Sequence, residues 1–145
     1  MIPRLGERVV PGRTYTHRPG VYLLACRGTD VLMTIQTEPE AEFQLPGGGV
    51  DPGEQPLHAL HREVMEETGW RIAAPRRIAT FRRFVFMPDY DMWAEKLCHV
   101  FAAHPVRQII DPTEPHHLAV WMPRDLAARH AVDPGHVAVL KGAMP

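Results

Sequence analysis

The sequence predicts a single domain of the α/β class. Runs rich in β-branched and aromatic residues lie before and after one amphipathic helical segment at residues 56–68, and two shorter helical segments close the chain. The length of 145 residues, with 45% hydrophobic and 23% charged residues, suits one domain with one core. We therefore expect one domain over residues 1–145, of which residues 1–19 form an irregular arm or an edge strand.

Composition argues against several other classes of protein. The formal net charge of −1 is spread without an acidic or basic block, so we expect neither a disordered chain nor stable nucleic-acid binding. Cys26 and Cys98 lie in apolar runs without metal-ligand or redox spacing, which predicts two buried thiols in a reducing cytoplasm. No run approaches the roughly 18 apolar residues of a membrane span, and no signal-peptide pattern opens the chain. We expect a cytoplasmic protein without a membrane-spanning part.

Three strand-like segments precede the helix. Residues 21–26 and 31–37 are rich in β-branched residues and are joined by a short glycine-containing turn, which predicts a β-hairpin. Residues 42–45 form a brief strand that leads into a glycine-rich loop at residues 46–49. Because glycine has no side chain, this loop is a place where the backbone can approach a phosphate or a metal closely.

Strands and short helices follow the central helical segment. That segment begins at Pro56, which suits the first helical position, and ends before Gly69, which suits a left-handed C-cap. Prolines separate the later segments and predict a loop over residues 105–117. The expected elements are strands at residues 71–72, 78–86, 93–103 and 118–122, and helices at residues 123–129 and 134–142.

The helical segment places three carboxylates on one side. On a helix that advances about 100° per residue, Glu66 and Glu67 lie within about 60° of Glu63. An adjacent apolar stripe, expected to anchor the helix, consists of Leu57, Leu60 and Val64. An acidic helix face is most often a solvated surface. Where solvent is excluded, however, the repulsion between the carboxylates needs a cation, and their oxygens suit Mg²⁺ or Mn²⁺.

The spacing of residues 48–70 favours the metal site over the solvated surface. A glycine, four glutamates, an arginine and a second glycine stand at fixed intervals, together with an apolar Val64 and a bulky Trp70. The fixed positions are Gly48, Glu54, Arg62, Glu63, Glu66, Glu67 and Gly69. This pattern resembles the complete signature of the Nudix hydrolase family.

The resemblance implies a fold and an activity. The implied fold is an α/β/α sandwich with a mixed β-sheet, in which the signature forms a loop-helix-loop. The implied activity is metal-dependent hydrolysis of a diphosphate bond in a compound of a nucleoside diphosphate linked to another group, by attack of metal-activated water on phosphorus. Mg²⁺ or Mn²⁺ is then the expected cofactor.

The resemblance also assigns roles within the signature. Glu63, Glu67 and the carbonyl of Gly47 are expected to bind the metal. Glu66 is either a third ligand or the base that takes the proton of the water. Arg62 is expected to orient the carboxylates through a salt bridge rather than to touch the substrate.

Residues around the signature complete the expected site. Glu54 is expected to orient the metal ligands from behind them. Glu114, in the proline-bounded loop, is a candidate general base, with an ordinary solvated loop acid as the alternative. The expected substrate contacts are phosphate binding by Arg82, Arg83 and Lys96 and base stacking by Tyr90.

The histidines near these residues are not expected to act in the site. His58 and His61 have a spacing that can bind metal, but on the helix both point away from the acidic face. His116 and His117 adjoin Glu114 and are expected to be an ordinary pair of loop residues.

Several substrates remain open. The compact chain favours a nucleoside triphosphate, including an oxidised one such as 8-oxo-dGTP. ADP-ribose, dinucleoside polyphosphates and 5′-triphosphate RNA are the alternatives. The family members that act on the first two carry diagnostic residues at positions where this chain has Phe86 and Pro88, so neither substrate is indicated. A non-catalytic nucleotide-sensing Nudix module is the alternative of another class, although such modules commonly lose signature glutamates that this chain retains. A homodimer through the arm or a strand edge is compatible with the sequence.

Overall fold

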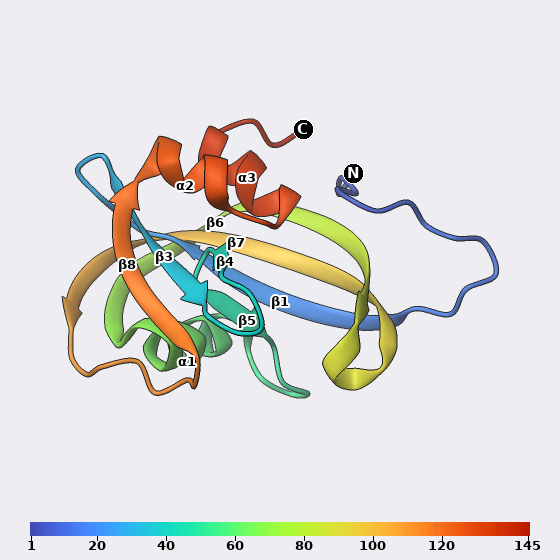
Figure 1. The fold of residues 1–145 in the computed structure, drawn as a ribbon, viewed down its shortest axis with the longest axis horizontal. Coiled ribbons are helices and arrows are strands. Elements are labelled where there is room, and N and C mark those ends of the chain that lie inside the picture. The colour runs from blue at the N-terminus through green and yellow to red at the C-terminus, as the bar shows by residue number, and fades with distance from the viewer.

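The computed structural model describes all residues 1–145 and contains two four-stranded β-sheets flanked by helices (Figure 1). One sheet has the strand order β5-β1-β7-β6, and in the other β3 pairs with β2, β4 and β8. Among the paired strands β1 and β7 run parallel and the remaining pairs are antiparallel, so the sheet layer is mixed. The strands are β1 (Thr16–Leu24), β2 (Cys26–Arg27), β3 (Asp30–Gln36), β4 (Glu42–Gln44), β5 (Gly47–Gly49), β6 (Trp70–Met87), β7 (Met92–Gln108) and β8 (His117–Pro123). The helices are α1 (Pro56–Thr68), the single 3₁₀ turn η1 (Pro88–Tyr90), α2 (Arg124–His130) and α3 (Pro134–Lys141).

Helices cover both sides of the sheets. In Figure 1, α2 and α3 lie on one side and α1 lies on the other. Successive residues of β1 point alternately to these two sides: Tyr22 belongs to the core cluster with α2 and α3, whereas Val21 and Leu23 belong to the cluster with α1. The predicted α/β/α sandwich is therefore confirmed.

The central helix has the predicted limits because its signals are local. Pro56 stands at the start, and Gly69 caps the end with a left-handed φ of 72°. The stripe anchors the helix through Leu60 and Val64, both fully buried. Leu57, the third predicted member of the stripe, is instead 44% exposed, like the other residues at the start of the helix.

The segments around β1 differ from the prediction in their pairing. Residues 21–24 pair with β7 in the parallel direction rather than with residues 31–36. The hairpin is limited to β2 and the start of β3 because the chain passes from one sheet to the other at Ala25. In that turn Cys26 is exposed, so the prediction of two buried thiols holds only for Cys98.

The N-terminal arm and β6 also differ from expectation. β1 begins at Thr16, inside the predicted arm, and the preceding residues lie along β6, where the Arg82 amide donates to the Pro3 carbonyl at 2.8 Å. The two predicted strands at residues 71–72 and 78–86 form one strand with register shifts, and Ala74 there has a φ of 51°. None of the helices has the length and apolar character that a bilayer crossing requires.

Candidate active site

Glu67 is the buried centre of the acidic helix face. It lies in the last turn of α1, and its Oε1 accepts a 2.8 Å hydrogen bond from the backbone N–H of Gly47. Burial raises the pKa of Glu67 to about 8, and the charges of Glu63, Glu114 and Glu66 act in the same direction, while the Gly47 N–H opposes them. A carboxylate in this position is destabilised unless a further positive charge approaches it.

The glycine loop fits against both the sheet and the helix. A Cβ at Gly47 would lie 2.0 Å from the Val21 carbonyl oxygen, and the φ of 151° at this position also favours glycine. A Cβ at Gly48 would lie 2.6 Å from the carboxyl carbon of Glu63. The two glycines therefore allow the backbone of β5 to lie directly against the carboxylates of α1.

Arg62 holds the acidic groups in place through several hydrogen bonds. Its Nε and one terminal nitrogen bind the two oxygens of Glu54, each at 2.8 Å. The other terminal nitrogen lies 3.0 Å from Oε1 of Glu63 and 3.4 Å from Oε2 of Glu66. The hydrogen bonds that Glu54 accepts, of which those from Arg62 have the largest effect, hold its pKa well below the usual range. Glu54 is therefore a fixed anion that orients Arg62.

Glu63 and Glu114 are brought to the same place from distant parts of the chain. Burial raises the pKa of Glu63, and the hydrogen bond from Arg62 partly offsets that effect. The Glu66 carbonyl accepts hydrogen bonds from the amides of Thr113, at 2.8 Å, and Glu114, at 3.0 Å. The loop before β8 is thus attached to α1, and the charge of Glu114 is close enough to raise the pKa of both Glu63 and Glu67.

His117 is the neighbour of Glu67 that sequence reasoning missed. Its Nε2 lies 3.5 Å from Oε2 of Glu67, whereas its neighbour His116 faces Glu38 at 3.6 Å on the surface. The pair was expected to be ordinary loop residues, but β8 begins at His117. His116 precedes the strand in a turn with a left-handed φ of 59°, so the two side chains point to different places. Only a predicted strand that began at residue 117 instead of 118 would have indicated that His117 faces the site.

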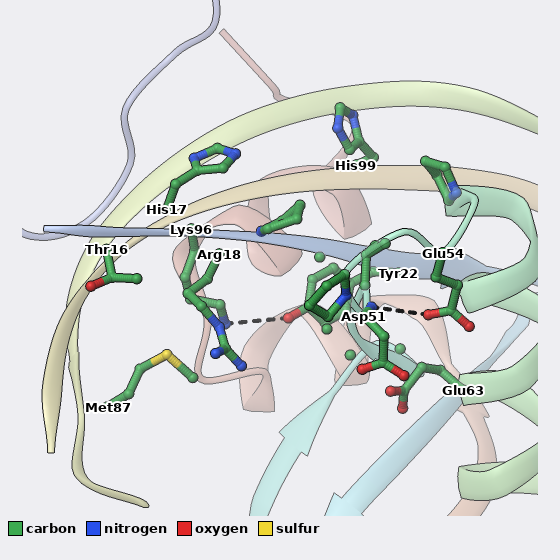
Figure 2. A pocket seen from close by; sticks show the side chains of 18 of the residues that line it. Thr16, His17, Arg18, Tyr22, Asp51, Glu54, Glu63, Met87, Lys96 and His99 are labelled. Carbon is green, nitrogen blue, oxygen red and sulfur yellow. Dashed lines mark hydrogen bonds between the residues drawn. The ribbon is translucent and has the colours of Figure 1, made fainter. Parts of the chain in front are cut away.

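A cavity of about 920 Å³ extends from the acidic cluster along β1 and β7. Figure 2 shows Asp51, Glu54 and Glu63 at one end and Arg18 and Met87 towards the other, with the Lys96–Tyr22 hydrogen bond of 3.3 Å between them. Burial raises the pKa of Tyr22 to about 12, and the Tyr22 oxygen keeps the pKa of Lys96 above its usual value. Lys96 is therefore a cation beside a neutral phenol at neutral pH.

The structure brings Lys96 and Tyr90 to this cavity but not Arg82 or Arg83. Tyr90 lines the cavity, and the Arg18 guanidinium lies 4.6 Å from the centroid of its ring. Arg83 instead binds Glu7 at 2.6 Å and Asp133 at 3.0 Å. Arg82 bonds to the arm through its backbone. The arm lies along β6, where Glu7 binds the Arg83 side chain, while the Arg82 side chain lies 4.0 Å from Glu95. A strand pattern does not reveal such partners.

The fold and the acidic cluster can be compared with known proteins. Residues 16–142 match the family model described as NUDIX domain. The chain belongs to the Nudix family. Among solved structures, the NUDIX hydrolase from Nitrosomonas europaea matches this Nudix chain with a TM-score of 0.73 at 16% identity and covers 87% of both chains. At that identity the match shows the shared fold.

Curated relatives match the Nudix protein over a shorter stretch. The RNA pyrophosphohydrolase of Pectobacterium atrosepticum is 33% identical over 69 residues, which are 48% of this chain and 39% of that protein. A Bacillus subtilis protein provisionally named as an 8-oxo-dGTP diphosphatase is 28% identical over 74 residues, which are 51% of this chain and 50% of that protein. The matched stretch thus spans half or less of the length of these relatives.

The residues of this Nudix site fit a divalent cation in their chemistry. Their donors are hard carboxylate and carbonyl oxygens, and burial disfavours the anionic forms of Glu63 and Glu67. No three His, Cys, Asp or Glu side chains already stand as a metal-binding group. The Arg62 guanidinium and the Gly47 N–H each bind Oε1 of one carboxylate, which leaves Oε2 of Glu63 and of Glu67 for an ion.

Proposed function

We propose that this Nudix protein is a metal-dependent hydrolase that cleaves a diphosphate bond of a nucleoside triphosphate. The observation that carries the proposal is one cavity: Glu63 and a close-packed glycine loop lie at one end, and Lys96 and Arg18 lie further along it. The buried Glu67 is joined to the same loop through the Gly47 N–H. A substrate with a charged diphosphate and a nucleoside matches both ends.

Glu63, Glu67 and the Gly47 carbonyl are the proposed holders of Mg²⁺ or Mn²⁺. The ion, when bound, would neutralise the charge of the phosphate oxygens and lower the pKa of a water molecule. The chain supplies the positioning, because Arg62 fixes Glu63 and the Gly47 N–H fixes Glu67.

Two carboxylates are the candidates for taking the proton of the attacking water. Glu66 has a side chain that is 36% exposed and has one long contact with Arg62, at 3.4 Å. Glu114 lies on the loop attached to the Glu66 carbonyl. We propose that one of these two groups, which lie beside the proposed metal ligands, is the general base.

The distance to Lys96 favours a substrate that extends beyond the diphosphate. Gly48 pairs with Val21, and Val21 pairs with His99, three residues from Lys96. Two strand spacings of about 4.8 Å and three residues of about 3.3 Å separate the Cα atoms of Gly48 and Lys96 by roughly 14 Å. The Lys96 side chain extends from its Cα to the Tyr22 hydroxyl at 3.3 Å, in the same cavity as Gly48 and Glu63. We propose that it contacts the part of a nucleoside triphosphate that lies beyond the metal-bound diphosphate.

A 5′-triphosphate RNA is the second candidate substrate. The observation in its favour is the name of the Pectobacterium relative, an RNA pyrophosphohydrolase. Its triphosphate end would occupy the same acidic region, and its first nucleoside would take the place of the free nucleoside at Lys96.

The test is hydrolysis of a substrate panel with Mg²⁺ or Mn²⁺ and with a chelator. The panel contains the common and 8-oxo nucleoside triphosphates, ADP-ribose, dinucleoside polyphosphates and a short 5′-triphosphate RNA, and the variant Glu67→Gln is the blank. Metal-dependent turnover that is fastest on free nucleoside triphosphates supports the proposal. Faster turnover of the RNA would show that RNA, not a free nucleoside triphosphate, is the substrate. Binding without any turnover would show that the protein is a nucleotide-sensing module and not a hydrolase.

A further inference from the structure

His117 and Glu67 face each other from two different elements. His117 begins β8 and Glu67 lies in the last turn of α1, yet Nε2 and Oε2 are 3.5 Å apart. Their side chains are only 15% and 11% exposed. The contact is thus a sheltered one beside the proposed metal ligands.

The hydrogen bonds of His117 fix its tautomer. Its Nδ1 lies 2.9 Å from the carbonyl oxygen of Pro115. A carbonyl oxygen only accepts, so Nδ1 carries the proton, and Nε2 of the neutral ring has a lone pair. This lone pair lies towards Oε2 of Glu67, so either a proton on Oε2 or a cation must lie between the two atoms.

A hydrogen bond holds Glu67 in this contact. Its Oε1 is held by the Gly47 N–H at 2.8 Å, which leaves Oε2 towards His117. The distance of 3.5 Å exceeds the usual range of about 2.7–3.2 Å for a nitrogen–oxygen hydrogen bond. Two ligands of one divalent ion, by contrast, lie about 3.0–3.4 Å apart when each metal–ligand bond is about 2.1 Å. The observed 3.5 Å is close to this ligand–ligand spacing, so the two atoms are near enough to share a cation.

We infer that Nε2 of His117 is a nitrogen ligand of the same divalent ion that Glu67 binds. The inference rests on the proposed function, which places that ion at the acidic face. A ring N–H that donates to a backbone carbonyl, as Nδ1 does to Pro115, is the usual support of a metal-binding histidine. Because imidazole suits transition metals and Mg²⁺ prefers oxygen, His117 gives the site a preference for Mn²⁺ over Mg²⁺.

The neighbouring histidines provide controls. His116 has a side chain that is 58% exposed and faces Glu38, and His58 has one that is 72% exposed and faces Glu54. Neither contacts Glu67. The variant His116→Gln therefore changes the adjacent residue in the same way without touching the acidic centre.

The first experiment detects nitrogen on the metal directly. The full chain receives one equivalent of MnCl₂ without substrate, and pulsed electron paramagnetic resonance records the ¹⁴N modulation of the bound Mn²⁺. We expect ¹⁴N modulation in the wild type that is replaced by ¹⁵N coupling when the histidines alone carry ¹⁵N. Bound Mn²⁺ without nitrogen coupling would overturn the inference, and this measurement needs no variant.

The second experiment assigns the nitrogen to His117. We expect His117→Gln to lose the modulation and to lower the ratio of Mn²⁺ to Mg²⁺ affinity by at least about tenfold. His116→Gln should keep both. Unchanged modulation in His117→Gln would contradict the assignment.

The two proposals fail in different ways. If Mn²⁺ binds, is lost in Glu67→Gln and shows no nitrogen coupling, the His117 inference is wrong and the proposed hydrolase is untouched. If the chain binds neither Mn²⁺ nor Mg²⁺ with or without nucleotide, the proposed function fails and the His117 inference fails with it.

Discussion

The backbone N–H of Gly47 donates a 2.8 Å hydrogen bond to Oε1 of Glu67, twenty residues further along the chain. This bond joins the glycine loop to the last turn of α1. Because a Cβ at Gly47 would lie 2.0 Å from the Val21 carbonyl oxygen, the loop is also fixed against the sheet. The buried carboxylate therefore has a defined position before any ligand binds.

Gly48→Ala should displace Glu63 without unfolding the protein. The new Cβ would lie 2.6 Å from the carboxyl carbon of Glu63, at the movable end of a side chain. We expect kcat to fall on the order of 10²-fold, as displacements of about 1 Å can cause. Gly49→Ala, whose Cβ has nothing within 4 Å, should stay within about twofold of the wild type. Equal losses in the two variants would show that Glu63 is not the sensitive group.

Glu67→Gln should remove at least about 99% of the turnover and stabilise the metal-free protein at high pH. The pKa of Glu67 is raised to about 8 in the folded chain from 4.5. Between pH 4.5 and about pH 8 the carboxyl of Glu67 is ionised in the unfolded chain but protonated in the folded chain. The free energy of unfolding of the wild type therefore falls as pH rises towards 8. The glutamine does not ionise, and its advantage in Tm should grow from about pH 5 to about pH 8. The exposed Glu40→Gln is the control, and a constant Tm difference would contradict the raised pKa.

Local signals predicted the part of the site that lies on α1. Pro56, Gly69 and the spacing of the acids fix the limits of the helix and the shared side of Glu63, Glu66 and Glu67. These features depend on neighbours within a few turns. The sequence was therefore sufficient for the helix and for the family.

Contacts between distant segments could not be read in the same way. The parallel pairing of β1 with β7 and the contact of His117 with Glu67 depend on how the sheets meet. Arg83 looked available for phosphate, but Glu7 and Asp133 bind it from two other segments. Residue type and strand pattern do not specify such partners.

Lys96→Met should weaken substrate binding more than it slows chemistry. Methionine keeps most of the apolar stem but removes the cation that donates to Tyr22 in the cavity. Because Lys96 lines the cavity but is not a proposed metal ligand, we expect KM for a nucleoside triphosphate to rise about tenfold, with kcat within about threefold of the wild type. The exposed Lys141→Met is the control. A fall in kcat with constant KM would place Lys96 at the reacting phosphorus instead.

His136→Asn should reduce the loss of unfolding free energy as the pH falls below neutral. His136 is buried, its Nδ1 accepts from the Leu45 amide at 3.2 Å, and burial lowers its pKa to about 4. Below pH 6.5 the unfolded chain gains a proton that the folded chain refuses, so stability falls with pH down to about 4. This group alone should cost the wild type about 2 kcal/mol between about pH 7.5 and about pH 5.

Asparagine at position 136 can accept from Leu45 without titrating, so chemical denaturation at the two pH values should show that loss in the wild type and not in the variant. The exposed His104→Asn should behave as the wild type does. A variant with the full wild-type slope would mean that His136 is not the titrating group.

Hydrolysis in water enriched in ¹⁸O tests the proposed function most directly. Each nucleoside triphosphate that the protein binds is incubated with Mg²⁺ or Mn²⁺, and mass spectrometry locates the label in the products. Cleavage of the diphosphate bond by water predicts one ¹⁸O per turnover, bound to phosphorus in either the nucleotide or the pyrophosphate, and none with a chelator or in Glu67→Gln. Intact, unlabelled substrate on the metal-loaded wild type would contradict the hydrolase and leave a protein that binds the nucleotide without cleaving it.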